Sequence, residues 1–128
     1  MFNLSKKTDY GIQLMIFLAK NWRKKPVSLR EIAKVRKLPF KYLEQLAMPL
    51  REAGLIEAKE GRGGGYFLER SPGKISVAEI VEILEGPVEV GGCAGCPSAG
   101  MCGQKDVWSE VGDKVRETIE GKFLKDLI

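Results

Sequence analysis

The 128-residue chain has no histidine, only three cysteines, and no apolar run near the ~20 residues that a membrane-spanning helix needs. Without an imidazole, the usual general base and the usual activator of a serine or cysteine nucleophile are missing. The sequence also contains no paired carboxylates in a recognisable catalytic site. We therefore expect no enzymatic activity, no small-molecule substrate and no membrane span.

The cysteine count and the N-terminal segment bear on the compartment. An odd number of cysteines argues against a closed disulfide framework. The apolar stretch over residues 12–19 is interrupted by Gln13 and lacks a cleavage site of small residues, so we expect no signal peptide. A cytoplasmic location follows, where thiols stay reduced and clustered cysteines favour metal binding over a disulfide.

Charge is distributed unevenly along the chain. Residues 1–70 carry 15 Lys and Arg against 7 Asp and Glu, a net charge of +8. Residues 71–128 carry 6 against 10, a net charge of −4. A basic front half joined to an acidic back half suggests a nucleic-acid-binding module followed by a sensing or assembly module. An ordinary solvated surface is the alternative.

Apolar spacing predicts three helices in the first half of the chain. The first covers residues 5–22, and the third covers residues 39–53 with Pro49 inside it, which predicts a kink. Between them, Ser28 and Glu31 form a capping box that starts the second helix. Gly54 is expected to end the third helix in the left-handed conformation. The predicted core face of the first helix comprises Ile12, Met15, Ile16, Ala19 and Trp22. The second and third helices, joined by a short turn, look like a helix-turn-helix.

Two short apolar segments follow the third helix. They cover residues 55–60 and 66–68 and flank a glycine-rich stretch at 61–65, which predicts a β-hairpin. A hairpin directly after a helix-turn-helix is the wing of a winged helix. The stretch lacks the Gly-Lys-Ser/Thr ending of a phosphate-binding P-loop.

The C-terminal part is again helical. A second capping box, Ser76 with Glu79, opens a short helix that ends at Gly86. A long amphipathic helix is predicted from residue 104 to about 121, followed by a final short helix. The apolar stripe of the long helix comprises Val107 or Trp108, Val111, Val115 and Ile119. So far from the winged domain, this stripe is expected to meet a partner subunit.

These elements predict a mainly α fold with a small β-hairpin wing. Residues 1–86 form a winged helix-turn-helix DNA-binding domain, and residues 87–103 form a cysteine loop. Residues 104–128 form a dimerisation helix and a short terminal helix.

All three cysteines, Cys93, Cys96 and Cys102, lie in the glycine-rich loop. Soft thiolates so clustered favour zinc, copper(I) or an iron–sulfur cluster over a role as buried apolar residues. The spacing of Cys93 and Cys96 suits zinc, which is the main chemical rival of a cluster.

The start of the second helix of a helix-turn-helix faces DNA bases. There, Gln45 can pair with adenine edges and Lys41 with guanine or phosphate. Glu44 repels phosphate but can accept from a cytosine amino group, and Tyr42 is a further candidate for contact with a base or a phosphate. Arg62 at the wing tip fits a narrow minor groove. The phosphate-contacting candidates are Ser5, Lys6, Lys7, Ser28 and Arg30. A solvated helix face is the alternative for these residues.

Four segments carry a family resemblance. They are residues 8–11 (Thr-Asp-Tyr-Gly), 42–46 (Tyr-Leu-Glu-Gln-Leu), 50–55 (Leu-Arg-Glu-Ala-Gly-Leu) and 61–66 (Gly-Arg-Gly-Gly-Gly-Tyr). With the three-cysteine loop before a long helix, the chain resembles the IscR and NsrR family of bacterial winged-helix transcription regulators. The resemblance implies a homodimer on palindromic-like double-stranded DNA. It also implies an iron–sulfur cluster on the three cysteines that changes DNA affinity.

The sequence departs from this family in its cluster ligands. Members that keep a cluster commonly have five residues in each gap between cysteines, whereas the gaps here are two and five. Where some members carry a histidine ligand, this chain has Lys105. In a nitric-oxide-sensing branch the fourth ligand is an aspartate of the partner subunit's first helix, and that residue matches Asp9. The alternative role for Asp9 is to complement the helix macrodipole.

The resemblance thus implies a DNA-binding regulator, with repression as the favoured sign and activation open. Its signal would be iron–sulfur status, redox or nitric oxide, through a cluster of 4Fe–4S or 2Fe–2S type. One rival function is a winged-helix regulator with a structural zinc and a protein partner. The other is an iron–sulfur electron carrier, which would have no use for a recognition helix and a wing.

Overall fold

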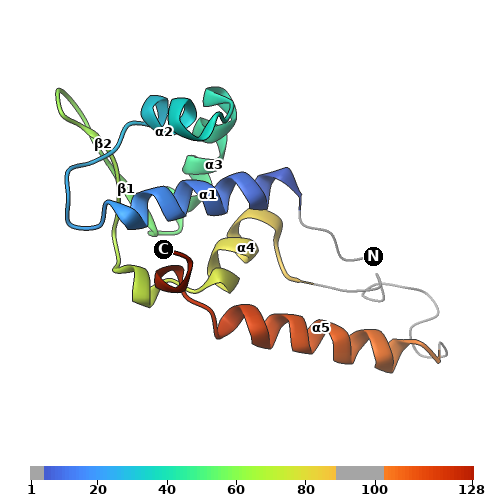
Figure 1. Ribbon diagram of the computed structural model, residues 1–128. Coiled ribbons are helices and arrows are strands. Elements are labelled where there is room, and N and C mark those ends of the chain that lie inside the picture. The colour runs from blue at the N-terminus through green and yellow to red at the C-terminus, as the bar shows by residue number, and fades with distance from the viewer. Residues whose placement is uncertain (1–4, 89–102) are drawn as a thin grey trace.

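The computed structural model describes residues 5–88 and 103–128. The helices are α1 (Lys6–Lys20), α2 (Leu29–Arg36), α3 (Phe40–Glu52), α4 (Val77–Glu85) and α5 (Lys105–Glu120), with 3-10 helices η1 (Pro72–Lys74) and η2 (Leu124–Leu127). Strands β1 (Ile56–Lys59) and β2 (Gly65–Leu68) form an antiparallel hairpin. The central α1 has α2 and α3 on one side and α4 and α5 on the other, with the hairpin beyond its end (Figure 1). The predicted winged helix-turn-helix with a long C-terminal helix is confirmed.

Helix α1 buries a wider face than its apolar spacing predicts. Met15 and Ala19 are buried as predicted, and Leu14 and Leu18 are buried in addition. The other predicted core residues, Ile12, Ile16 and Trp22, are only half-buried. The reason is that α1 packs against α3 and α4 together, so no single stripe defines its interior.

The predicted helix starts are confirmed at both serines. The Ser28 hydroxyl accepts a hydrogen bond from the backbone N–H of Glu31 at 3.1 Å, and Ser76 accepts one from Glu79 at 3.1 Å. Each bond satisfies one backbone donor that a helix N-terminus leaves free. These caps set the first residues of α2 and α4. The cap at Ser28 thereby also sets where the connection between α1 and α2 ends.

Helix α3 continues through Pro49 to Glu52. Proline cannot donate the backbone hydrogen bond that this position normally makes in a helix. Three fully or nearly fully buried leucines, Leu43, Leu46 and Leu50, hold both sides of the proline against the core. Gly54, with φ of +81°, ends this helix in the left-handed conformation as predicted.

The wing is fixed to the helix-turn-helix by backbone contacts. Strands β1 and β2 pair from Ile56 with Leu68 to Lys59 with Gly65. Beyond the strand pairing, Val27 and Tyr66 exchange two backbone hydrogen bonds of 2.9 and 2.7 Å. The chain that enters α2 therefore runs directly beside β2, so the wing and α2 are held in one relative position.

The C-terminus returns to the winged domain. The N–H of Leu124 donates to the Ile75 carbonyl at 2.8 Å, and the Leu124 side chain is fully buried in the main core. Helix α5, which precedes Leu124 in the chain, packs on α4. The division into segments 1–86, 87–103 and 104–128 stays a prediction, with η2 contributing to the same core as the winged helix.

None of the helices that the structure describes is both long enough and apolar enough to cross a membrane.

Candidate nucleic-acid interface

The outward face of α3 is a row of exposed side chains. Lys41, Glu44, Gln45 and Met48 are exposed, because the leucines on the other side of the helix face the core. Residues three, four and seven apart share one helix face, so these four side chains lie in one row. The predicted base-reading residues Lys41, Glu44 and Gln45 are thus brought together.

The first turn of α3 is held by two aromatic contacts. The Arg30 guanidinium of α2 lies 4.4 Å from the centre of the Phe40 ring, a cation–π distance. On the other side, the half-buried Tyr42 ring meets the Tyr10 ring of α1 edge to face, with centroids 5.6 Å apart. Arg30 is therefore positioned beside the helix start that is predicted to face DNA, and Tyr42 is largely used in packing.

The N-terminus of α1 lies next to the same turn. Ser5, Lys6, Lys7 and Tyr42 line one open pocket together with Glu85 from the end of α4. The Ser5 N–H donates to Glu85 Oε1 at 2.8 Å, and the Ser5 hydroxyl donates to the same oxygen. The hydroxyl bond, followed by the backbone bond from Ser5, lowers the pKa of Glu85 against the opposing effect of burial.

The contact with Glu85 changes the expectation for Ser5. Its hydroxyl is already bound to a carboxylate that repels phosphate, whereas Lys6 and Lys7 are exposed. Ser28 is likewise engaged as a helix cap, although its hydroxyl hydrogen is available to donate. Lysines 6 and 7 and Arg30 are therefore the better placed of the predicted phosphate-contacting residues.

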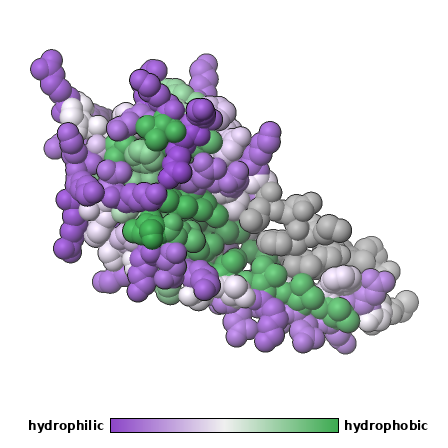
Figure 2. Space-filling model, in the orientation of Figure 1, coloured by the Kyte–Doolittle hydropathy of each residue, from purple (hydrophilic) through white to green (hydrophobic). Residues whose placement is uncertain are grey.

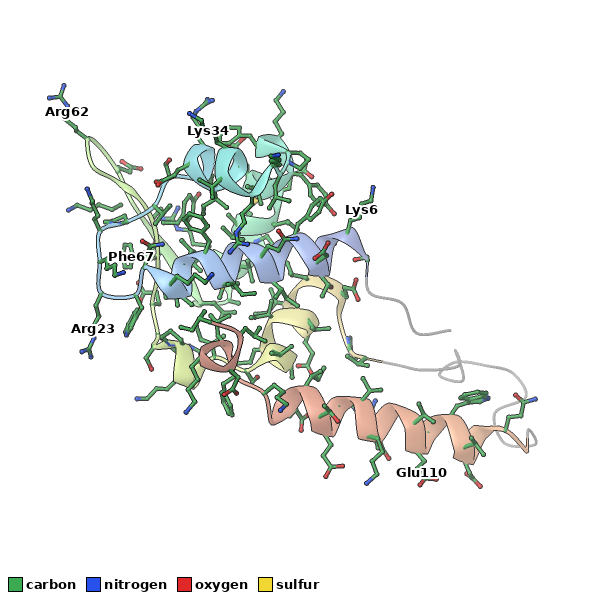
Figure 3. The ribbon with its side chains drawn as sticks, viewed as in Figure 1. Lys6, Arg23, Lys34, Arg62, Phe67 and Glu110 are labelled. Atoms are coloured by element: carbon green, nitrogen blue, oxygen red, sulfur yellow. The ribbon has the colours of Figure 1, made fainter. Side chains whose placement is uncertain are left out.

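Arg62 projects from the tip of the wing. The tip turns through Gly61 and Gly63, whose φ angles of +89° and +76° suit glycine. In Figure 3, Arg62, Lys34 of α2 and Lys6 of α1 all project toward one side of the molecule, whereas Arg23 projects away from it. Within residues 5–88 and 103–128, no salt bridge involves Lys6, Lys34 or Arg62.

Two residues of this face were missed by the sequence reasoning. Lys34 lies on the exposed side of α2, and Met48 continues the row on α3 with 63% of its surface exposed. The spacing of seven between Lys41 and Met48 was the signal that could have found Met48. It was overlooked because only polar residues of this helix were considered as candidates for contact with DNA.

The predicted metal-binding cysteines, Cys93, Cys96 and Cys102, lie outside the described residues. Among the residues that are described, no group of three or more Cys, Asp or Glu could hold a metal ion. The proposed fourth ligand, Asp9, is exposed in the first turn of α1, where its carboxylate accepts a hydrogen bond from Gln13 Nε2 at 3.0 Å.

Both described ends of the cysteine loop lie at α5. The Val88 carbonyl accepts a hydrogen bond of 2.7 Å from Arg116 Nη1, and Arg116 also pairs with Asp113. The other end, Gly103, leads into α5 at Lys105. Eleven residues separate positions 105 and 116, which is about three helical turns or ~16 Å. Val88 and Gly103, the last described residues before and after the cysteines, therefore both lie next to α5.

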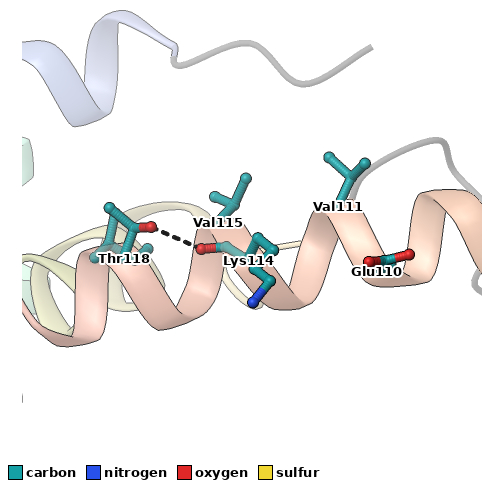
Figure 4. Close-up of a pocket in the computed structure, with 6 residues that line it drawn as sticks. Glu110, Val111, Lys114, Val115 and Thr118 are labelled. Carbon is teal, nitrogen blue, oxygen red and sulfur yellow. Dashed lines mark hydrogen bonds between the residues drawn. The ribbon is translucent and has the colours of Figure 1, made fainter.

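One face of α5 is apolar and uncovered by the described residues. Val107, Trp108 and Val111 are 55%, 37% and 38% exposed. Farther along the helix is a largely apolar pocket lined by Glu110, Val111, Lys114, Val115, Thr118 and Ile119 (Figure 4). In Figure 2 the same helix carries an apolar band that extends from the core. This is the stripe predicted to meet a partner subunit.

Comparisons with known proteins agree on one family. The model of the Rrf2 family, described as an iron-dependent transcriptional regulator, matches residues 4–128. The HTH-type transcriptional regulator CymR of Bacillus subtilis (strain 168) is 36% identical over 124 residues, covering 97% of this chain and 88% of the relative. The regulator IscR of Xenorhabdus nematophila is 30% identical over 128 residues, covering 98% and 78%.

Solved structures give the same result. The chain is similar to B. subtilis CymR, described as the global cysteine regulator, with a TM-score of 0.87, 38% identity, and coverage of 99% of this chain and 96% of that one. It is also similar to T. potens IscR, with a TM-score of 0.83, 36% identity and coverage of 98% and 85%. These relatives are transcription regulators and not enzymes.

Proposed function

This chain belongs to the Rrf2 family of transcription regulators, which are not enzymes, and we propose that its homodimer reads duplex DNA with α3 and the wing. We propose further that a cluster held by the cysteine loop regulates that binding. The observation that carries the DNA-binding proposal is the exposed row on α3, with Arg30 beside its first turn, together with the exposed Arg62 at the tip of the wing. The net charge of +8 over residues 1–70 supports it.

In this proposal, residues at different positions contact different parts of the DNA. Gln45, Lys41 and Glu44 contact base edges in the major groove, where adenine, guanine and cytosine present different hydrogen-bonding groups. Arg62 enters the minor groove beside it. The phosphate contacts come from Lys6, Lys7, Ser28 and Arg30. Ser5 can join them once its hydrogen bonds to Glu85 are broken. Tyr42 positions the start of α3.

The dimer is proposed on the exposed apolar face of α5. Burying Val107, Trp108 and Val111 against a second copy removes apolar surface from water at roughly 25 cal/mol per Å². Two recognition helices about 34 Å apart then fit two half-sites one helical turn apart. A dimer bound over a promoter would exclude polymerase, so repression is the predicted sign.

An iron–sulfur cluster fits the donor set of this chain. Cys93, Cys96 and Cys102 would supply three thiolates, and Asp9 of the partner subunit would supply a carboxylate as the fourth ligand. A bound cluster would supply sensitivity to oxidants, nitric oxide and iron supply. Carboxylate oxygen is a harder ligand than thiolate, so a site completed by Asp9 is expected to be labile.

Arg116 offers the physical link between the loop and the dimer. It holds the Val88 carbonyl where the chain leaves α4, and Val88 is itself buried. Binding of a cluster by the three cysteines would therefore act on α5 through Val88 on one side and through Gly103 on the other. Ligand binding changes DNA affinity only if it favours one arrangement of the two subunits over another.

A second candidate is a regulator that responds to cysteine status without a cluster. It is favoured by the relative described as the global cysteine regulator of B. subtilis. A structural zinc on the same three cysteines is the remaining alternative, and it shares the DNA-binding part of the proposal.

Analysis of anaerobically purified protein distinguishes these three possibilities. The cluster proposal predicts brown protein with iron and acid-labile sulfide, and loss of both in Cys93→Ala, Cys96→Ala and Cys102→Ala. Colourless protein with stoichiometric zinc would favour the structural metal. Protein without any metal would contradict both and favour cluster-free regulation.

The same preparation tests the fourth ligand. Asp9→Ala should leave fold and oligomeric state intact, shift the absorption spectrum of the cluster and hasten its loss in air. Asp9→Cys should slow that loss. The matched control is Gln13→Ala, which removes the hydrogen bond to Asp9 but no ligand. A spectrum and lifetime of Asp9→Ala equal to the parent would exclude Asp9 as the ligand.

A further inference from the structure

Met48 is an apolar residue on the exposed side of α3. Its side chain is 63% exposed, whereas the leucines around it on α3 are buried. Single exposed apolar residues are common on protein surfaces and by themselves need no explanation. What distinguishes Met48 is its location, because it extends the row formed by Lys41, Glu44 and Gln45.

The helix geometry sets Met48 two turns along from Lys41. Seven residues correspond to ~700°, or nearly two full turns, so the two side chains project in almost the same direction. Gln45 lies three residues before Met48 and therefore beside it on the same face. A duplex that contacts both Lys41 and Gln45 in its major groove would also meet Met48.

The major groove offers one apolar partner for such a side chain. Base edges there present hydrogen-bond donors and acceptors, and thymine alone adds a methyl group. Methionine is unbranched and flexible, so its thioether can adapt to a small apolar target. We infer that Met48 contacts a thymine methyl group in the operator and makes α3 selective for thymine at that position. This inference rests on the proposed DNA-binding function.

A protein partner fits this part of the surface less well. The row that contains Met48 carries Lys41 and Glu44, and residues 1–70 as a whole have a net charge of +8, which favours a polyanion as the partner of this part of the chain. The apolar face proposed for dimerisation is on α5, on the other side of α1 and α4 (Figure 1). Met48 is therefore separate from the subunit interface.

The test first selects a duplex and then removes single methyl groups. Full-length protein is used to enrich a random duplex library, and the enriched sequence is remade with each thymine replaced in turn by deoxyuridine. The replacement keeps base pairing and removes only the methyl group. At one position in each half-site, the parent protein should lose about fourfold in affinity, equivalent to about 0.8 kcal/mol for one buried methyl-sized group. Met48→Ala should show no loss there.

Two variants keep the result specific. Met48→Leu keeps an apolar side chain and should retain the response to deoxyuridine. Val35→Ala is the matched control, because Val35 is 60% exposed on α2 and outside the α3 row, and it should respond as the parent does. If the parent is indifferent to every replacement, or if Met48→Ala responds as the parent does, the inference is wrong. If no duplex is enriched at all, the proposed function fails as well.

Discussion

Single residues decide how closely the wing approaches the helix-turn-helix. A Cβ added to Gly65 would lie 2.5 Å from the carbonyl carbon of Val27 and 2.6 Å from its oxygen. These atoms belong to the backbone that exchanges hydrogen bonds with Tyr66, so they cannot move aside independently. The φ of Gly65, +150°, is also one that other residues rarely adopt.

Gly65→Ala is therefore expected to destabilise the protein and displace the wing. The expected cost is about 1–3 kcal/mol, measured as the free energy of unfolding in urea. Gly61→Ala is the control, because Gly61 has a positive φ but nothing within 4 Å of an added Cβ. A smaller loss for Gly61→Ala supports the close contact, and equal losses would show that only the backbone conformation matters.

For single residues, the sequence predicted the structure correctly where a residue type satisfies a requirement of the adjacent backbone. The serine caps and Gly54 were predicted correctly, because each satisfies a local requirement of a helix end. The engagement of Ser5 by Glu85 was missed. Those residues are 80 positions apart, and only the packing of α1 against α4 brings them together.

Among the secondary-structure elements, the helix-turn-helix and the wing could be predicted from the sequence. The helices have apolar residues at helical spacing, and the wing has two short apolar segments around a glycine-rich turn. The buried residues of α1 could be predicted only in part. Periodicity finds one apolar stripe, but α1 contacts neighbours on two sides, and Leu14 and Leu18 are buried as a result. Met48 was missed for a different reason, since only polar residues of this helix were considered as candidates for contact with DNA.

The wing supplies a prediction of its own. Arg62→Ala should weaken binding to duplexes with A-tracts beside the recognition sequence more than to duplexes with G·C-rich flanks, because narrow minor grooves attract arginine. The expected difference is about 1 kcal/mol, measured by titration of labelled duplexes at one fixed salt concentration.

Arg23→Ala is the matched control for Arg62→Ala. Arg23 is also an exposed arginine in a connecting segment, but it projects away from the side that carries Arg62 (Figure 3). It should leave the preference for A-tracts unchanged. A loss with Arg62→Ala that is independent of the flanks would assign Arg62 to phosphate contact alone.

The protein as a whole is proposed to be a dimer that forms through α5. Val111→Glu places a charge in the middle of the exposed apolar face and should convert the dimer to a monomer, because an unpaired charge in an interface is costly. Sedimentation equilibrium measures this directly. Affinity for a duplex with two half-sites should fall with it.

The control introduces the same charge on another face. Ser109 is exposed on α5, and two residues of helix place it ~200° around the axis from Val111. Ser109→Glu should therefore remain dimeric. If Val111→Glu remains dimeric as well, the subunit interface lies elsewhere and the apolar face needs another partner.

Whether α3 reads bases is tested by the ratio of the protein's affinities for the selected duplex and for a random duplex. Gln45→Ala should lower this ratio by removing a contact worth about 1–3 kcal/mol to one base pair. Lys7→Ala, at an exposed position proposed to contact phosphate, should weaken both duplexes alike and leave the ratio unchanged. Equal losses on both duplexes for Gln45→Ala would show that α3 does not read bases through Gln45.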